Sequence, residues 1–250
     1  QQSESRMKCL LLADNRPQLT STLEPILKHW GYRVITASDV GRLKTFLSES
    51  DLSLLVIGEK FLHDPELSSL LKQVAQKKKL PIMALQQEHC ESKTVSPYQT
   101  LEVPVDVFAL FAFIQRHVEQ HPRENLRLRL QLPGMYRTKE DGYILADVLS
   151  LSTQGLFFKT SHRHLQKEDQ LNVVIPLLGH CQELELDATV LYVIEPLATN
   201  NYMQGIGVYF NDMSAEQKDQ LKKYIEHHFL SQVATHQDGT EDPSTLRTSN

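Results

Sequence analysis

The spacing of apolar residues changes midway along this chain, and this change constrains the fold more than any other feature. Up to about residue 120, short apolar runs such as 9–13 and 54–57 alternate with segments whose apolar residues recur every three or four positions. From Leu126 to Leu132, apolar and polar residues alternate one by one. The first pattern is typical of strands followed by helices, and the second of half-buried strands. The sequence therefore predicts two domains of different classes.

The first half is predicted to be an α/β domain with a doubly wound parallel sheet. Buried strands are expected at 9–13, 33–36, 54–57 and 80–85, with a fifth before Pro104. Helical stripes are expected over 19–30, 40–47, 67–74 and 106–120. Regular alternation of strands and helices favours a parallel sheet covered by helices. Pro25 is expected to bend or shorten the first helix, because proline lacks the N–H that helical bonding needs.

The second half is predicted to be mainly β, ending in a helix. Strands are expected at 126–132, 143–149, 155–160, 170–175, 184–193 and 203–210, and Pro133-Gly134 is expected to turn the chain after the first of them. Ser214 and Gln217 have the spacing of a capping box, and an apolar stripe follows at 221–229. This order predicts a barrel closed by a C-terminal helix.

The expected domain boundaries are 7–120 for the first domain and 121–232 for the second. No Gly/Ser linker separates them, since Pro122 ends the last helix of the first domain and Arg123 follows at once. Met7 is a candidate natural start, with residues 1–6 as an extension. Residues 233–250 are rich in Thr, Asp, Gly, Pro and Ser, and this composition predicts a disordered tail.

Charge and cysteine content exclude several classes of protein. A net charge of −5 argues against a general nucleic-acid or membrane-surface binder. A local basic stretch is nevertheless present, at Arg116, Arg123, Arg127 and Arg129. The three cysteines are too far apart for C-x-x-C spacing, so neither a disulfide framework nor a metal site is indicated. The apolar runs are too short to insert in a membrane, which favours a cytoplasmic protein.

Two short motifs carry the functional signal. The first is an R-x-x-x-R pair, Arg123 and Arg127, and the second is an S-x-S-x-x-G turn formed by Ser150, Ser152 and Gly155. A guanidinium is a planar, permanently charged fork that binds phosphate through two hydrogen bonds and matches the O6/N7 edge of guanine. Small hydroxyls in a turn can bond a base edge or phosphate, and a glycine permits close approach.

Together, the two motifs resemble the ligand signature of PilZ domains, which are receptors for the bacterial messenger cyclic di-GMP. The family pattern is R-x-x-x-R followed by [DN]-x-S-x-x-G, and Ser150 stands where the family has Asp or Asn. The resemblance implies a cyclic di-GMP site at Arg123, Arg127, Ser150, Ser152 and Gly155, with no metal and no other cofactor. The strand 205–210 also resembles the G-x-G-V-x-F strand of the family, and its glycines are assigned to core packing.

The first half resembles the receiver domains of two-component response regulators, over residues 7–119. The shared phrases are Leu12-Ala13-Asp14-Asn15, Gly31-Tyr32-Arg33-Val34 and Pro81-Ile82-Met83-Ala84-Leu85. The family's phosphotransfer residues are missing, however. Only Asp14 of the metal-binding acidic pair remains, Gly58 ends the third strand where an acceptor Asp is needed, and Gln86 and Val103 replace the Ser/Thr and the Lys. Glu59 is nearby but out of register. The resemblance therefore implies a scaffold without phosphotransfer that docks a protein partner or a second copy of itself.

Enzymatic alternatives have little support in the sequence. His117 and His121 are spaced like two metal ligands on a helix, but no third ligand is identifiable and a surface pair is favoured. No nucleophile elbow is present. The chain is therefore expected to be a cyclic di-GMP-binding effector in a bacterial cytoplasm, not an enzyme. Its ligand is expected to order the connection at 122–126 and to reorient the domains. The alternatives are a PilZ-type interaction adaptor that has lost nucleotide affinity, which Ser150 would explain, and a phosphorylated regulator, which would need a carboxylate at the acceptor position.

Overall fold

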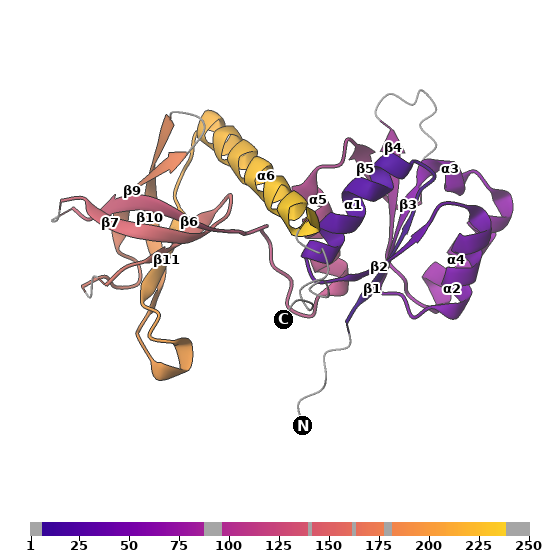
Figure 1. The fold of residues 1–250 in the computed structure, drawn as a ribbon, viewed down its shortest axis with the longest axis horizontal. Helices are drawn as coiled ribbons and strands as arrows, with labels where there is room; N and C mark the ends of the chain where they lie inside the picture. The colour runs from indigo at the N-terminus through magenta and orange to yellow at the C-terminus, as the bar shows by residue number, and fades with distance from the viewer. Residues whose placement is uncertain (1–6, 88–96, 140–141, 162–163, 178–181, 239–250) are drawn as a thin grey trace, which may run out of the picture. The chain divides into compact units, whose positions relative to one another are not determined.

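The computed structural model describes residues 7–87, 97–139, 142–161, 164–177 and 182–238 (Figure 1). They divide into two compact units. One contains the chain up to Glu124 together with the segment from Leu230, and the other is Asn125–Phe229. The expected domain boundaries, 120/121 and 232/233, stay predictions.

The first unit is built on a five-stranded parallel sheet. Its strands are β1 (Cys9–Ala13), β2 (Arg33–Ala37), β3 (Leu54–Gly58), β4 (Ile82–Gln87) and β5 (Gln99–Val103). They lie in the order β2-β1-β3-β4-β5, and every adjacent pair is parallel. This is the flavodoxin-like order of doubly wound domains, so the predicted receiver-like fold is confirmed.

Helices cover both faces of this sheet. They are α1 (Pro17–His29), α2 (Val40–Glu49), α3 (Glu59–Leu62), α4 (Pro65–Lys77) and α5 (Val107–Val118). One core cluster packs the sheet against α2, α3 and α4, and a second packs it against α1 and α5. Asp39, Asp64 and Asp106 accept backbone N–H bonds at the starts of α2, α4 and α5, which fixes where those helices begin. Pro25 does not shorten α1, because Leu23, Ile26 and Leu27 around it are buried in the core.

The second unit is a closed barrel of six strands, as predicted. They are β6 (Leu128–Arg137), β7 (Ile144–Leu151), β8 (Gly155–Lys159), β9 (Gln170–Leu177), β10 (Gln182–Ile194) and β11 (Gly205–Phe210), in the closed order β10-β11-β8-β7-β6-β9. A short 3₁₀ helix, η1 (Ala198–Asn200), lies between β10 and β11. Every neighbouring pair is antiparallel.

The predicted turn at Pro133-Gly134 is wrong, because β6 runs through both residues to Arg137. Pro133 pairs with Asp147 of β7, while the pairing of β6 with β9 begins only at Met135. Proline is tolerated where one side of a strand has no ladder partner. Gly134 is needed for close packing, since a β-carbon there would stand 3.0 Å from the rings and methyls of Phe158 and Val148.

Helix α6 (Ala215–Asp238) follows the barrel. The predicted capping box is confirmed: Ser214 Oγ accepts from the Gln217 N–H, and Gln217 Oε1 accepts from the Ser214 N–H. The predicted stripe Leu221, Tyr224, Ile225 and Phe229 is buried. The helix continues past residue 233, where a disordered tail was expected, and Thr235 Oγ1 bonds the Ser231 carbonyl within it. The rest of the expected tail, 239–250, lies outside the described residues. Among the helices described, none is long and apolar enough to cross a membrane.

Candidate functional site

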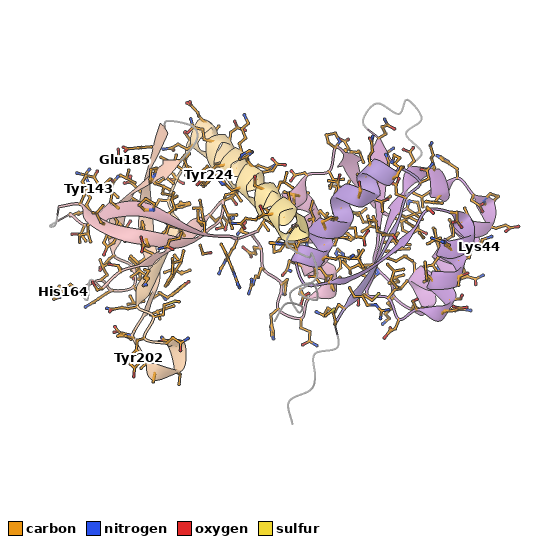
Figure 2. All side chains as sticks on the ribbon, in the orientation of Figure 1. Lys44, Tyr143, His164, Glu185, Tyr202 and Tyr224 are labelled. Carbon is orange, nitrogen blue, oxygen red and sulfur yellow. The ribbon has the colours of Figure 1, made fainter. Side chains whose placement is uncertain are left out.

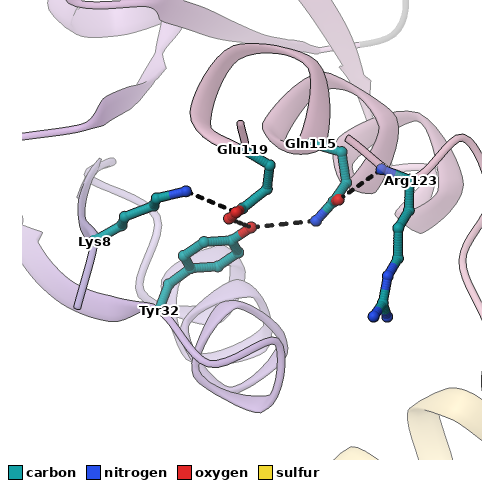
Figure 3. Close-up of polar contacts among 5 residues, drawn as sticks. All are labelled: Lys8, Tyr32, Gln115, Glu119 and Arg123. Carbon is teal, nitrogen blue, oxygen red and sulfur yellow. Dashed lines mark hydrogen bonds and ion pairs between the residues drawn. The ribbon is translucent and has the colours of Figure 1, made fainter. Parts of the chain in front are cut away.

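Arg123 lies between α5 and β6, and its backbone is held while its side chain is exposed. Its N–H donates to Oε1 of Gln115 on α5, at 2.9 Å (Figure 3). Sequence alone predicts few anchors for the connection 122–126. The structure has two, this bond and the burial of Leu126, which is 3% exposed. The bond to Gln115 could not be predicted from local sequence, because a glutamine inside an apolar helix gives no sign of its long-range partner.

Arg127 immediately precedes β6 and is also exposed. Among the described residues, no hydrogen bond or ion pair involves the guanidinium of Arg123 or Arg127. An exposed guanidinium without a carboxylate partner keeps its full hydrogen-bonding capacity for an external anion. The first predicted motif thus has two exposed guanidinium groups, Arg123 in the first unit and Arg127 in the second.

Ser152 is committed to the turn between β7 and β8. Its Oγ accepts from the N–H groups of Gln154 and Gly155 and donates to the Gly155 carbonyl, at 3.1–3.3 Å. The backbone N–H of Ser152 also bonds that carbonyl, at 2.8 Å. Ser152 is 8% exposed. The hydroxyl predicted to contact a ligand therefore already holds the shape of the turn.

Gly155 is required by the neighbouring strand. A β-carbon at this position would collide with the backbone carbonyl of Val208 and stand 3.1 Å from the α-carbon of Tyr209, both in β11. The predicted close approach at Gly155 is thus real, but the approaching group is β11. The second motif fixes the barrel's geometry and leaves Ser150 as its outward-facing member.

Ser150 lies in a row of outward-facing residues that crosses five strands. It pairs with Arg129 of β6 on one side and with Phe157 of β8 on the other. Phe157 pairs with Gly207 of β11, and Gly207 with Tyr192 of β10. The sequence neighbours of Phe157, Leu156 and Phe158, are buried in the barrel, so the row occupies the outer face. We call Arg129, Ser150, Phe157, Gly207 and Tyr192 the outer row.

Two aromatic rings of the outer row lie over glycines. The rings of Phe157 and Tyr192 are nearly parallel, with an interplanar angle of 20° and centroids 6.4 Å apart. A β-carbon on Gly205 would stand 2.6 Å from the Phe157 ring, and one on Gly207 would collide with the Tyr192 ring. The assignment of these glycines to core packing is therefore wrong: Ile206 and Val208 fill the core, and alternation turns the glycines outward.

Sequence reasoning missed the aromatic members of the outer row. Phe157 and Tyr192 are 35 positions apart and meet only because β8 and β10 both pair with β11. Gly205 and Gly207 are the sequence signal for this contact. Two glycines on one face of a strand leave room for large side chains to pack over them.

In the first unit, the remaining acidic residue of the receiver pattern is paired with an arginine. Arg16 Nε and Nη2 donate to the two carboxylate oxygens of Asp14 at 2.9 and 2.7 Å, and the Arg16 N–H adds a bond of 2.8 Å. The Asp14 side chain is fully buried. Within the described ranges, no three His, Cys, Asp or Glu side chains are grouped as metal ligands. His117 Nδ1 lies 2.9 Å from the Phe113 carbonyl oxygen of its own helix.

Residues 119–227 match the family model described as the PilZ domain, so this chain carries a PilZ domain. Among solved structures, it is similar to the Bacillus subtilis inhibitor of motility MotI/DgrA, with 17% identity over 44% of this chain and 51% of that chain and a TM-score of 0.39. The PilZ domain of YcgR from Escherichia coli with c-di-GMP matches at 15% identity over 48% of this chain and 98% of its own, with a TM-score of 0.38.

The signal receiver domain of an HD domain-containing protein from Pseudomonas fluorescens Pf-5 is also similar, with 20% identity over 46% of this chain and 96% of its own and a TM-score of 0.39. The match to MotI/DgrA thus spans about half the length of that chain. No curated protein matches this one.

Proposed function

We propose that this protein is a signalling effector that binds cyclic di-GMP on the outer face of its PilZ barrel. The observation that carries the proposal is the pair of exposed, uncommitted arginines, Arg123 and Arg127, in a PilZ domain whose outer row begins with a third arginine and continues into two aromatic rings. The ligand is a dianion with two flat guanines. Its chemistry requires both positive charge and surfaces for stacking.

Each part of the ligand has a proposed partner. Arg123 and Arg127 contact the phosphates or guanine edges through charge-assisted hydrogen bonds. Ser150 offers a hydroxyl to a base edge from the middle of the outer row. Phe157 and Tyr192 provide an apolar surface for a base. Ser152 and Gly155 act by holding the turn that places Ser150 beside Phe157. The whole outer row spans about 19 Å, from four strand spacings of about 4.8 Å each.

Binding is tested by isothermal titration of the full chain with cyclic di-GMP, with cyclic di-AMP as the matched control. We expect saturable one-site heat with the guanine ligand and much weaker binding of the adenine one, because adenine lacks the O6 acceptor that an arginine fork matches. Arg123→Ala and Arg127→Ala should each cost about 2–5 kcal/mol of binding, and Lys should restore only part of it. Arg116→Ala removes an exposed charge from α5 and should bind like the wild type. Parental affinity in both site variants would place the ligand elsewhere.

A second candidate is an interaction adaptor that does not bind nucleotide. Two observations favour it: Ser150 lacks the carboxylate or amide of the family pattern, and the Ser152 hydroxyl is already bonded within its turn. The same titration separates the two, since the adaptor predicts no heat at millimolar ligand.

We propose that ligand binding changes the orientation of the two units through the connection that contains Arg123 and Arg127. A ligand held by Arg123 from the first unit and by Arg127, Ser150 and the outer row from the second would restrict the orientation of one relative to the other. A ligand drives such a change only as far as it prefers the restricted arrangement. The receiver-like unit would then present its surface to a protein partner or to a second copy of the chain.

A further inference from the structure

The backbone of Arg123 ends a chain of hydrogen bonds that begins at Lys8, the residue before β1. Lys8 Nζ donates to Oε2 of Glu119 at 2.6 Å, and the Tyr32 hydroxyl donates to Oε1 of the same carboxylate at 2.7 Å. Gln115 Nε2 donates to the Tyr32 oxygen at 3.3 Å, and its Oε1 accepts the Arg123 N–H at 2.9 Å. Figure 3 shows this succession. We call Lys8, Tyr32, Gln115 and Glu119 the Gln115 network.

The centre of the Gln115 network is buried, whereas Lys8 and Glu119 at its other end are partly exposed. Gln115 is 9% exposed and Tyr32 7%. Burial, followed by the bonded Glu119 carboxylate, raises the pKa of the Tyr32 hydroxyl. Burial alone would raise the pKa of Glu119, but the bonds from Lys8 and Tyr32 and the charges of Lys8 and Arg123 lower it below its usual range. Every polar group therefore has a defined partner, and a buried glutamine with both ends bonded has one preferred orientation.

Arg123 is hydrogen-bonded to this network only through its backbone, while the charge of its side chain acts on Glu119. In Figure 3 its side chain extends away from Gln115 and Tyr32, and no hydrogen bond or ion pair is drawn from its guanidinium to the four residues. The residue is exposed. Fixing the peptide at 123 restricts the positions that the guanidinium can reach and leaves its charge available to an external anion.

We propose that Gln115 is a positioning residue for the ligand arginine: held by Tyr32, which Glu119 bonds in turn, it sets the backbone of Arg123 from within the receiver-like unit. This inference rests on the proposed cyclic di-GMP site. It gives the receiver-like unit a direct part in nucleotide affinity that needs no phosphorylation. Pre-positioning lowers the ordering cost of binding, so loss of the network should weaken binding although no network side chain touches the ligand.

The test compares dissociation constants for cyclic di-GMP. Gln115→Leu removes both amide bonds at similar volume and should raise the dissociation constant about tenfold. Tyr32→Phe removes only the hydroxyl that orients Gln115, and it should raise the constant about threefold to fivefold. Lys44→Met is the control for a lysine outside the network. Lys44 bonds one glutamate as Lys8 does, at 2.7 Å for Lys44–Glu66 and 2.6 Å for Lys8–Glu119. Lys44 lies on α2 (Figure 2), and its loss should leave binding unchanged.

A double-mutant cycle separates positioning from general destabilisation. If Gln115 acts through Arg123, Gln115→Leu should have little further effect in the Arg123→Ala background. An equal fold-loss in both backgrounds would show a merely structural role and would overturn the inference. Tyr32→Phe provides the same comparison if Gln115→Leu fails to fold.

Amide hydrogen exchange at Arg123, measured without ligand, checks the bond itself. It should be faster in Gln115→Leu and Tyr32→Phe than in the wild type and unchanged in Lys44→Met. Wild-type binding with unaltered affinity in both network variants would overturn this inference alone. An absence of wild-type binding would overturn the proposed function, and with it this inference.

Discussion

The carboxylate of Asp14 lies in the space that a side chain at Gly58 would need: a β-carbon there would collide with Asp14 Oδ2. The same carboxylate is bonded by the guanidinium of Arg16. Gly58 ends β3, where receiver domains have their acceptor aspartate, so one residue of the acidic site is absent and another is neutralised by an arginine. In receiver domains a carboxylate at this position accepts the phosphoryl group, and Gly58 has no side chain to do so.

The first prediction is that the chain does not accept a phosphoryl group. Incubation with acetyl phosphate or beryllofluoride and Mg²⁺ should leave the intact mass and the amide spectrum of residues 7–120 unchanged. A phosphorylated adduct at Glu59 or Asp51 would contradict the loss of receiver chemistry. An active receiver domain treated in parallel serves as the positive control.

The second prediction concerns the stability of the first unit. Gly58→Ala should lower its free energy of unfolding by about 1–3 kcal/mol, because the methyl group displaces a buried carboxylate that accepts three hydrogen bonds from Arg16. Fluorescence of Trp30, the chain's single tryptophan, follows this unit in urea. Gly41→Ala in α2 is the control and should cost less stability than Gly58→Ala, since its one close neighbour is Oδ1 of the exposed Asp39 side chain, at 3.3 Å. Equal stability of the two variants would mean that Asp14 moves aside without cost.

The third prediction separates two serines of one motif. Ser150→Asn should keep or strengthen cyclic di-GMP binding, because an amide both donates and accepts. Ser152→Ala should lower the stability of the barrel by about 1–2 kcal/mol, because two turn N–H groups lose their acceptor, and it should weaken binding as a consequence. Titration and urea unfolding measure the two effects. A marked loss of affinity in Ser150→Asn would show that Ser150 is not the residue aligned with the family's Asp or Asn.

Periodicity predicted the elements of both units because burial repeats along the chain with the period of each element. The predictions are wrong where a long-range contact, and not the local sequence, determines the backbone conformation. Pro133-Gly134 has the composition of a turn, yet β7 and the packing of Phe158 and Val148 keep it in a strand. Pro25 has the mark of a helix breaker, yet the buried residues around it keep α1 continuous.

The motifs single out the residues of the candidate site, and their binding of a ligand stays a prediction, but the motifs do not show which contacts each residue makes within the protein. Arginine and serine types at motif spacing reveal a ligand signature, but they do not reveal that the Ser152 hydroxyl is bonded within its turn. Nor does local sequence pair Gln115 with Arg123, or Phe157 with Tyr192, because these partners meet through strand order and side-chain reach.

The fourth prediction tests the aromatic part of the outer row. Tyr192→Ala should weaken cyclic di-GMP binding by about 1–3 kcal/mol if a guanine stacks on this surface. Tyr202→Ala is the control, since Tyr202 is 71% exposed beyond η1 in the β10–β11 connection (Figure 2) and is not part of the row. Titration of both variants gives the comparison. Equal affinities would confine the ligand to the arginine side of the barrel.

The last prediction concerns the output of binding. Cyclic di-GMP should slow hydrogen exchange across residues 120–130 and change the distribution of distances between the two units. Nitroxide labels at Lys72 on α4 and Glu183 on β10, both exposed, would report the distances, and attachment through unnatural amino acids avoids the three native cysteines. Arg123→Ala should abolish the change even at ligand concentrations that restore saturation, because this arginine is the ligand contact that comes from the first unit. An unchanged distance distribution at saturating ligand would show that binding does not reorient the units. The signal would then have to come from a change within the barrel.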